Sequence, residues 1–437
     1  MRSWQRSRGR ESRTDLSLPR GIRDVEPEEY ERHARVRRAF EETASLFNFK
    51  LMEPATIESL SILRAKSGAD VDKEIYSFKD KGGRDLGLRF DLTVGMTRYV
   101  CSRRDLRPPV KLACVGGVWR YDEPQHARYR FHTQWDVEIY GASSIDADAE
   151  VIDFGRSIFD RLGMSKDSVE IGDRRVIQEF ISKRLKVDSE ERAVEMMRAL
   201  DKVQKKSRSE LVKEYTEKGF KQSDLEMLLE FGNLKGTPSA VLSKLGELKL
   251  ESAAELAELA DRLSSRGLRN YEYNLSIVRG IDYYTAVVFE VVDSARPDLG
   301  SLCGGGRYDL LPKLLGRPDL AATGAAGGID RAALSLEGVK SEPIHLTLVA
   351  FAGKDVYGKA LELLAKLRAA GVRAEIQSQD RPLGKQLEDA SAMGATWALI
   401  IGKKEISAGT VTLRDMRQRN EAQLPFGEAL ERIAKGD

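Results

Sequence analysis

The first apolar pattern along the chain is helical, and alternating patterns follow it. Between Glu28 and Phe47 apolar residues recur at the spacing of an amphipathic helix. Segments 74–78 and 86–91 then alternate apolar and polar residues on either side of the Lys-Gly-Gly-Arg turn at 81–84. Alternation that flanks a glycine pair predicts a β-hairpin.

A longer hairpin is predicted next, and its polar face is distinctive. Its strands are segments 110–121 and 130–140, and the polar stretch 122–129 joins them. Both strands carry charged residues on one face, which is unusual for a purely structural pair of strands.

The middle of the chain changes character. From about 173 to 269 aromatic residues thin out, and Lys, Glu and Leu dominate at helical spacing, which predicts a helical insertion. After it, the β-branched run Thr285–Val292 predicts a strand and the glycine-rich segment Leu302–Asp309 predicts a turn. Segment 321–328 predicts a strand or loop that feeds a helix starting near Asp330.

Beyond Pro343 strand and helix patterns alternate regularly. Strands are predicted over 346–350, 373–376 and 398–401, and helices over 357–370 and 383–393. Such alternation indicates an α/β layer with a partly parallel sheet. We therefore expect a separate C-terminal domain.

Composition and charge exclude several classes of protein. The chain has 437 residues, of which 41% are hydrophobic and 32% charged, so it is neither a disordered chain nor a small disulfide-stapled scaffold. Lys plus Arg (71) nearly balance Asp plus Glu (69), and the net charge of +2 gives no general affinity for polyanions. A nucleic-acid partner would have to be held by local patches.

The few cysteines and histidines, and the lack of long apolar runs, set the expected compartment. Only 3 Cys and 4 His are present, so we expect no metal site built from protein His or Cys, and a reducing cytoplasm fits best. No apolar run approaches the roughly 18 residues of a membrane helix, and no signal-peptide core is found.

Residues 1–17 are rich in Arg, Ser and Gly and are expected to form a flexible basic tail, which either touches RNA phosphates or has no specific role.

Four segments each contain an arginine or an acidic residue among apolar residues with a strand-like pattern. They are segments 89–93, 119–125, 278–284 and 327–331. Guanidinium groups suit phosphate oxygens, and several that converge would match a polyphosphate. A single arginine more often pairs with a nearby acid at the surface, but four segments framed by glycines and aromatics favour an anion site. Neither a Walker loop nor a nucleophile elbow is present.

Several of these segments match the motifs of one family. The matching segments are Pro-Arg-Gly-Ile-Arg-Asp at 19–24, Leu-Arg-Phe-Asp-Leu-Thr-Val at 88–94, 119–125 with 128–130, 278–289, 303–309, 324–334, and 402–405 with 409–416. In these motifs the chain resembles the histidyl-tRNA synthetases, which are class II aminoacyl-tRNA synthetases, in their archaeal and eukaryotic form. The stretch 88–94 resembles the family's histidine-binding strand, 119–130 its motif 2 and 324–334 its motif 3.

The resemblance implies an α+β fold with a C-terminal α/β domain. The catalytic domain, built on a class II antiparallel sheet, would occupy 18–172 and 271–340. The helical insertion would occupy 173–270, and the anticodon-binding domain 343–437. The resemblance also implies a cytoplasmic homodimer with no membrane partner.

The implied reaction has two steps. Histidine and ATP, with Mg²⁺, give histidyl-adenylate and pyrophosphate, and the histidyl group then passes to the 3′-terminal adenosine of tRNA-His. By motif match, Arg120 holds the α-phosphate and Arg331 grips the γ-phosphate and lies against adenine. Asp122 and His132 belong to the same ATP site, and Arg279 stabilises charge at the α-phosphate.

Histidine selection needs partners for the imidazole ring and the ammonium group. The resemblance assigns Glu138 and Tyr284 to the ring, and Tyr283 and Arg279 lie beside them. Around the ammonium group it assigns Asp91, Thr93 and Gln134. Taken alone, Glu138 could be the polar face of a strand, and the two tyrosines could be core aromatics.

Three positions depart from the pattern or are weakly assigned. Gly95 stands where the family has proline after Asp-Leu-Thr-Val, and this loosens the turn after Asp91. His132 stands where an aromatic residue is expected to stack on adenine. Gln125, in the motif 2 loop, is assigned to the acceptor end of the tRNA.

Two rival functions remain open at this point. One is a catalytically inactive relative, such as the regulatory subunit of ATP phosphoribosyltransferase or a synthetase-like sensor domain. The other is an unrelated ATP-binding α+β protein. Arg120, Arg279 and Arg331 together with a C-terminal domain favour the active synthetase over the first rival, and the joint spacing of the motifs disfavours the second.

Overall fold

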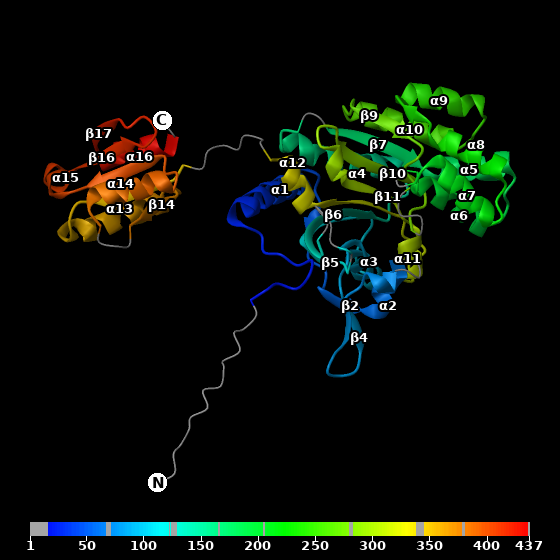
Figure 1. The fold of residues 1–437 in the computed structure, drawn as a ribbon, viewed down its shortest axis with the longest axis horizontal. Helices are drawn as coiled ribbons and strands as arrows, with labels where there is room; N and C mark the ends of the chain where they lie inside the picture. The colour runs from blue at the N-terminus through cyan, green and yellow to red at the C-terminus, as the bar shows by residue number, and fades with distance from the viewer. Residues whose placement is uncertain are drawn as a thin grey trace, which may run out of the picture. The chain divides into compact units, whose positions relative to one another are not determined.

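The computed structural model describes residues 16–66, 71–121, 123, 129–164, 167–203, 206–278, 283–337, 345–377 and 381–435. The chain divides into two compact units, one that ends at Glu337 and one that begins at Gly338 (Figure 1). The basic tail expected over 1–17 lies almost entirely outside the described residues.

A nine-stranded sheet forms the centre of the first unit. In spatial order its strands are β1 (Lys50–Leu51), β5 (Val110–Trp119), β6 (Phe131–Tyr140), β12 (Ala322–Gly328), β11 (Ser301–Arg307), β10 (Val287–Asp293), β7 (Asp167–Asp173), β9 (Tyr271–Asn274) and β8 (Lys235–Gly236). From β5 to β7 every neighbouring pair is antiparallel, while β1 and β9 pair in parallel with β5 and β7. The expected antiparallel sheet is confirmed.

The longer predicted hairpin is the β5–β6 pair, with Val110 opposite Tyr140 and Trp119 opposite Phe131. Strand side chains alternate between the two faces of a sheet. On β6 the apolar residues Trp135, Val137 and Ile139 enter the large hydrophobic core. The opposite face therefore carries the polar residues Gln134, Asp136 and Glu138.

Helices cover the apolar face of the sheet. They are α1 (Pro27–Leu46), α4 (Ile145–Arg161) and α12 (Ile329–Ser335). The ring of Phe40 on α1 stacks on Trp135 with centroids 5.4 Å apart, and Phe154 of α4 meets Phe40 edge-on. The helix predicted over 28–47 is confirmed. Because the helices cover the apolar face of β6, its other face is the one that can form a site.

Small elements stand on that other face. They are α2 (Leu60–Leu63), α3 (Thr93–Ser102), α11 (Leu310–Leu314) and the sheet of β2 (Ile57–Ser59), β4 (Asp85–Leu88) and β3 (Ser77–Lys79). The first predicted hairpin is confirmed, because β3 and β4 pair antiparallel.

The expected strand over 88–94 is wrong beyond Leu88, since β4 ends there and Thr93 opens α3. The carboxylate of Asp91 accepts a hydrogen bond from the Val94 N–H at 3.1 Å, and such side-chain acceptors start helices. Gly95 consequently lies in a helix and not in a turn. A Cβ there would lie 2.8 Å from that of Pro54, so the glycine permits close packing.

The turn expected over 302–309 is also wrong, because these glycines lie in β11 near the middle of the sheet. A Cβ on Gly305 would lie 2.1 Å from the Gly324 oxygen, and one on Gly306 would lie 2.2 Å from the Val287 oxygen. Glycine in a strand marks a close approach of backbone, which is its role here.

The segment after β7 is largely helical. Its helices are α5 (Arg174–Leu185), α6 (Glu190–Asp201), α7 (Arg208–Glu217), α8 (Gln222–Gly232), α9 (Pro238–Glu247) and α10 (Ala253–Ser265). Strand β8 interrupts them and pairs with β9. Buried leucines such as Leu228 and Leu259 belong to the same core as the nine-stranded sheet, so these helices are part of the first unit.

The second unit is a sheet with apolar cores on both faces. Its strands, in spatial order, are β14 (Ala374–Ile376), β13 (Thr347–Phe351), β15 (Trp397–Ile401), β16 (Thr410–Asp415) and β17 (Glu421–Pro425). Its helices are α13 (Tyr357–Ala369), α14 (Leu383–Ala392), α15 (Lys403–Ala408) and α16 (Phe426–Lys435). The first three strands are parallel, which confirms the predicted α/β layer. Among the described residues of both units, no helix combines the length and the apolar character that a membrane crossing requires.

The buried side chain of Gln386 bonds to the backbone of β13, and a substitution there tests the packing of the second unit. It accepts from the Phe351 N–H at 3.1 Å and donates to the Phe351 oxygen at 2.9 Å, beyond the point where β14 ends. We expect Gln386→Leu to destabilise this unit by about 2 kcal/mol, because buried backbone groups lose their partners. Faster amide exchange at Phe351 would be the direct readout. Gln423→Leu, at an exposed site of the same unit, should leave that amide protected.

Candidate active site

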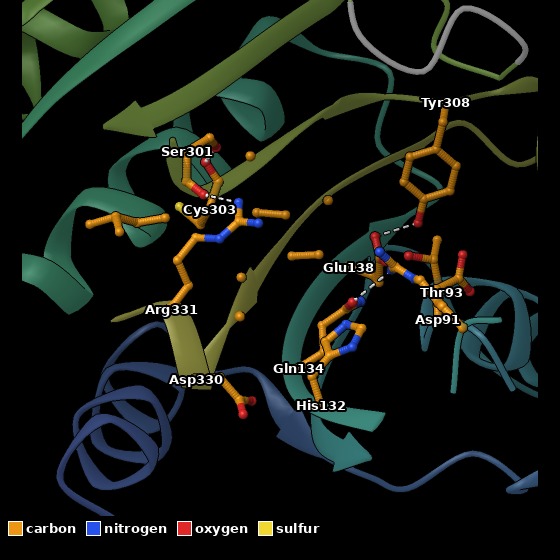
Figure 2. A pocket seen from close by; sticks show the side chains of 18 of the residues that line it. Asp91, Thr93, His132, Gln134, Glu138, Ser301, Cys303, Tyr308, Asp330 and Arg331 are labelled. Atoms are coloured by element: carbon orange, nitrogen blue, oxygen red, sulfur yellow. Dashed lines mark hydrogen bonds between the residues drawn. The ribbon is translucent and has the colours of Figure 1, made fainter. Parts of the chain in front are cut away.

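A cavity of about 490 Å³ opens on the polar face of the first unit's sheet (Figure 2). Its walls come from β6, β11 and β12 and from the starts of α3 and α12. Most of the predicted site residues line it, namely Asp91, Thr93, Arg120, His132, Gln134, Glu138, Tyr283, Tyr284 and Arg331. Arg279, Asp122 and Gln125 lie outside the described residues.

Glu138 carries a buried acid into one end of the cavity. Its carboxylate accepts a hydrogen bond from the Tyr308 hydroxyl, and Asp91 and Thr93 lie nearby (Figure 2). Burial and the charge of Glu138 raise the pKa of Tyr308 well above its usual value, so the phenol stays protonated and donates.

Gly324 makes room for this carboxylate. A Cβ at position 324 would lie 1.6 Å from Glu138 Oε2. The glycine on β12 is therefore a steric requirement of the acid on β6, which is its neighbour in the sheet.

A hydrogen-bonded chain connects Arg120, Gln134 and Thr93, which line the cavity, to the buried Asp136. The Arg120 guanidinium donates to the Phe90 oxygen at 2.9 Å and to Gln134 Oε1 at 3.1 Å. The fully buried carboxylate of Asp136 accepts from Gln134 Nε2 at 2.7 Å and from the Thr93 hydroxyl at 3.1 Å. One buried acid thus orients two of the predicted residues, Thr93 and Gln134, and Gln134 in turn accepts from Arg120.

Arg331 occupies the other end of the cavity. Its guanidinium donates to the Ser301 oxygen at 2.8 Å, close to Cys303 and away from Glu138 (Figure 2). His132 lines the cavity from the second residue of β6. The cavity consequently has a cationic end and an acidic end, as a substrate with both phosphate and ammonium or imidazole groups requires.

Two important residues escaped prediction from the sequence. Asp136 has the same alternation as Gln134 and Glu138, so the period of two could have identified it. Tyr308 follows the glycines that were expected to form a turn, and only the pairing of β11 with β12 brings it to Glu138.

Arg89 has a structural role and does not line the cavity. It is buried, and its guanidinium donates to the Gly117 oxygen at 2.8 Å and to the Pro54 oxygen at 2.7 Å. For this arginine the anion-binding interpretation is not supported.

Among the described residues, one group has the spacing of a metal site. Glu29, His33 and Asp330 each offer a ligand atom within 4.8 Å of the others. The guanidinium of Arg23 already donates to the carboxylates of Glu29 and Asp330. The cation that this group binds is therefore the side chain of Arg23.

The chain matches known families over both units. A model of the histidyl-tRNA synthetase family matches residues 21–332, and an anticodon binding domain matches residues 347–436. Histidine–tRNA ligase of Thermococcus kodakarensis is 36% identical over 431 residues, which is 96% of this chain and 98% of that protein.

Solved structures share the fold. A histidyl-tRNA synthetase from Nostoc sp. PCC 7120 aligns with a TM-score of 0.85 at 23% identity, over 97% of this chain and 100% of its own. A Bacillus halodurans protein described as an ATP phosphoribosyltransferase regulatory subunit/histidyl-tRNA synthetase aligns with a TM-score of 0.73 at 26% identity, over 89% and 98% of the two chains.

A polar cavity on an antiparallel sheet, followed by a unit that matches anticodon-binding domains, defines an aminoacyl-tRNA synthetase. Within that class, the chain belongs to the histidyl-tRNA synthetase family. The resemblance drawn from its motifs is confirmed.

The contact between Gly324 and Glu138 can be tested by adding one methyl group. Gly324→Ala should destabilise the first unit by about 2 kcal/mol, because the carboxylate must leave Tyr308. Gly328→Ala, on the same strand, should change stability far less, since its Cβ would meet nothing closer than 3.7 Å. Urea unfolding followed by tryptophan fluorescence measures the difference. Equal stabilities of the two variants would contradict the steric argument.

Proposed function

We propose that this chain is a histidine–tRNA ligase that activates histidine with ATP and transfers the histidyl group to the 3′-terminal adenosine of tRNA-His. AMP and pyrophosphate are the other products. The observation that carries the proposal is one cavity that Arg120 and Arg331 line, with Arg331 at one end and Glu138 with Tyr308 at the other. This charge separation matches ATP on one side and a basic amino acid on the other.

The arginines bind phosphate in this proposal. Arg120, held by Phe90 and Gln134, meets the α-phosphate, and Arg331 meets the γ-phosphate and adenine. His132 and Asp122 belong to the same ATP site, and Arg279 stabilises the charge that develops at the α-phosphate. Mg²⁺ enters as part of the substrate, bound to the phosphates of ATP.

The acidic end selects histidine. Glu138 and Tyr284 bind the imidazole ring, with Tyr283 and Arg279 beside them. Asp91, Thr93 and Gln134 bind the ammonium group, and the bonds from Thr93 and Gln134 to Asp136 support this arrangement. A site built to hydrogen-bond a ring nitrogen rejects analogues that lack it, because its own buried groups would stay unpaired.

Catalysis in this scheme needs no covalent enzyme intermediate. The histidine carboxylate attacks the α-phosphorus, pyrophosphate leaves, and the guanidinium groups stabilise the added negative charge. In the second step the adenosine hydroxyl attacks the histidyl carbonyl, and AMP leaves.

The remaining assignments concern the rest of the assembly. Residues 343–437 bind the anticodon and Gln125 touches the acceptor end, while 173–270 is a helical insertion between the two catalytic parts, 18–172 and 271–340. The enzyme is a class II homodimer of the cytoplasm. Two features support self-association of the first unit. Strand β1 lies at the edge of the sheet, and Leu51 on β1 and Leu46 on the adjoining α1 are exposed.

The decisive experiment is ATP–pyrophosphate exchange without tRNA, run with each standard amino acid. We expect exchange with histidine alone. Folded protein that binds histidine but gives no exchange would favour a regulatory or sensor relative over the ligase.

Glu138→Gln tests the selection of histidine. Loss of the charged acceptor should cost about 2 kcal/mol of histidine binding, or roughly 30-fold in KM for histidine. The KM for ATP should stay within about twofold, since the acid lies at the other end of the cavity. Glu272→Gln, on β9 outside the cavity, is the matched control. An unchanged KM for histidine would refute the assignment of Glu138 to the ring.

A further inference from the structure

Residues 19–23 run along the base of the segment that joins β5 to β6. The Gly21 oxygen accepts from the Arg130 N–H at 2.9 Å, and the Arg20 oxygen accepts from the Arg130 guanidinium at 3.2 Å. Arg130 in turn pairs with Arg120 through its backbone, because the Arg120 N–H donates to the Arg130 oxygen at 2.9 Å. The N-terminal segment is therefore attached to the connection at Arg130, which is itself paired with Arg120.

Arg23, at the end of this segment, joins three further elements. Its guanidinium lies over the Tyr129 ring, 4.1 Å from the centroid, and donates to Asp330 Oδ1 at 3.1 Å. It also binds both carboxylate oxygens of Glu29 on α1. The bond to Glu29 raises the pKa of Arg23 and lowers that of Glu29, so the pair stays charged.

Asp330 carries this attachment to the cavity wall. Its second oxygen accepts from the Thr133 N–H at 2.9 Å, which ties the first turn of α12 to β6. Its side chain points away from that of Arg331, the next residue, which reaches into the cavity (Figure 2). The orientation of Arg331 thus depends on how Asp330 is held.

Arg23 itself lies outside the lining of the cavity, whereas Tyr129, His132 and Arg331 are part of it. Arg331 lies at the cationic end of the cavity (Figure 2). Tyr129 is linked to Asp330 through Arg23, and His132 precedes Thr133, whose N–H donates to Asp330. The Glu138–Tyr308 pair lies at the opposite end, away from Asp330 and Arg331 (Figure 2). A disturbance at Arg23 should therefore reach the cationic half first.

We propose that Arg23 is a positioning residue for the nucleotide end of the cavity. It fixes Asp330, and through it Arg331, against the start of β6 and against Tyr129, and it touches neither substrate. This inference rests on the proposed function, in which Arg331 and His132 face ATP.

The experiment compares Arg23→Gln with Arg20→Gln in the full chain. Small misplacements of a binding group are expensive, so Arg23→Gln should raise the KM for ATP in the exchange reaction by about tenfold. The KM for histidine should change by less than about twofold, because the acidic end keeps its contacts. Arg20 belongs to the same segment, but its side chain pairs with Glu123 at the surface, where the two side chains are 74% and 75% exposed. Its variant should match the wild type.

A third variant, Arg23→Lys, provides a further comparison if Arg23→Gln folds poorly. Lysine keeps the positive charge at Asp330 but loses the two-pronged bond to Glu29 and the planar contact with Tyr129. The KM for ATP of Arg23→Lys should therefore lie between those of Arg20→Gln and Arg23→Gln. Equal KM values for ATP in all variants would overturn the proposal. Parallel rises in both KM values would also overturn it, since they indicate a merely structural role.

The affinity for ATP measured by calorimetry separates this inference from the proposed function. A wild type that binds ATP but shows no exchange would contradict the ligase, while weaker ATP binding by Arg23→Gln than by Arg20→Gln would still support the positioning role. Equal ATP binding by these two variants would overturn the positioning role whatever the exchange assay shows.

Discussion

The site depends on the close approach of β6 and β12, which brings Glu138 against Gly324. β6 has to bury both of its faces, one apolar beneath α1 and α4 and one polar above the cavity. An ionised acid in a buried strand is tolerated only where hydrogen bonds compensate for its lost hydration. Tyr308 supplies such a bond, and glycine at position 324 supplies the space. The position of the acidic end of the cavity follows from these two contacts.

A buried polar network gives the site its rigidity. Asp136, fully removed from solvent, orients Thr93 and Gln134, and Gln134 accepts a bond from Arg120. Groups that are fixed in this way do not have to reorganise when charge develops on a substrate, and that preorganisation is the main source of electrostatic stabilisation in enzymes. At the cationic end Arg23, which lies outside the lining of the cavity, holds Asp330 in a similar way.

Patterns of local residues predicted most elements well. The long hairpin β5–β6 was visible because alternation sustained along two strands is typical of a sheet with one apolar face, and the parallel strands of the second unit followed from apolar segments of strand length between helices. Two segments were predicted wrongly. The glycines of β11 are typical of a turn, and only the close packing of β12 and β10 against them requires a strand. Thr93 was expected in a strand, but it opens a helix in which the Asp91 carboxylate accepts the Val94 N–H.

The sequence by itself determined the family, the polar face of β6 and nine of the residues that line the cavity, because these are carried by motifs and by a period of two along one strand. Only the tertiary structure decided which polar groups support them. Tyr308 reaches Glu138, and Arg23 reaches Asp330, across 170 and 307 residues of chain. It also decided that Arg89 braces the backbone and does not line the cavity, since an arginine looks the same in sequence whether it faces carbonyl oxygens or a cavity. Contacts of such separation depend on which strands become neighbours, and no local pattern encodes that choice.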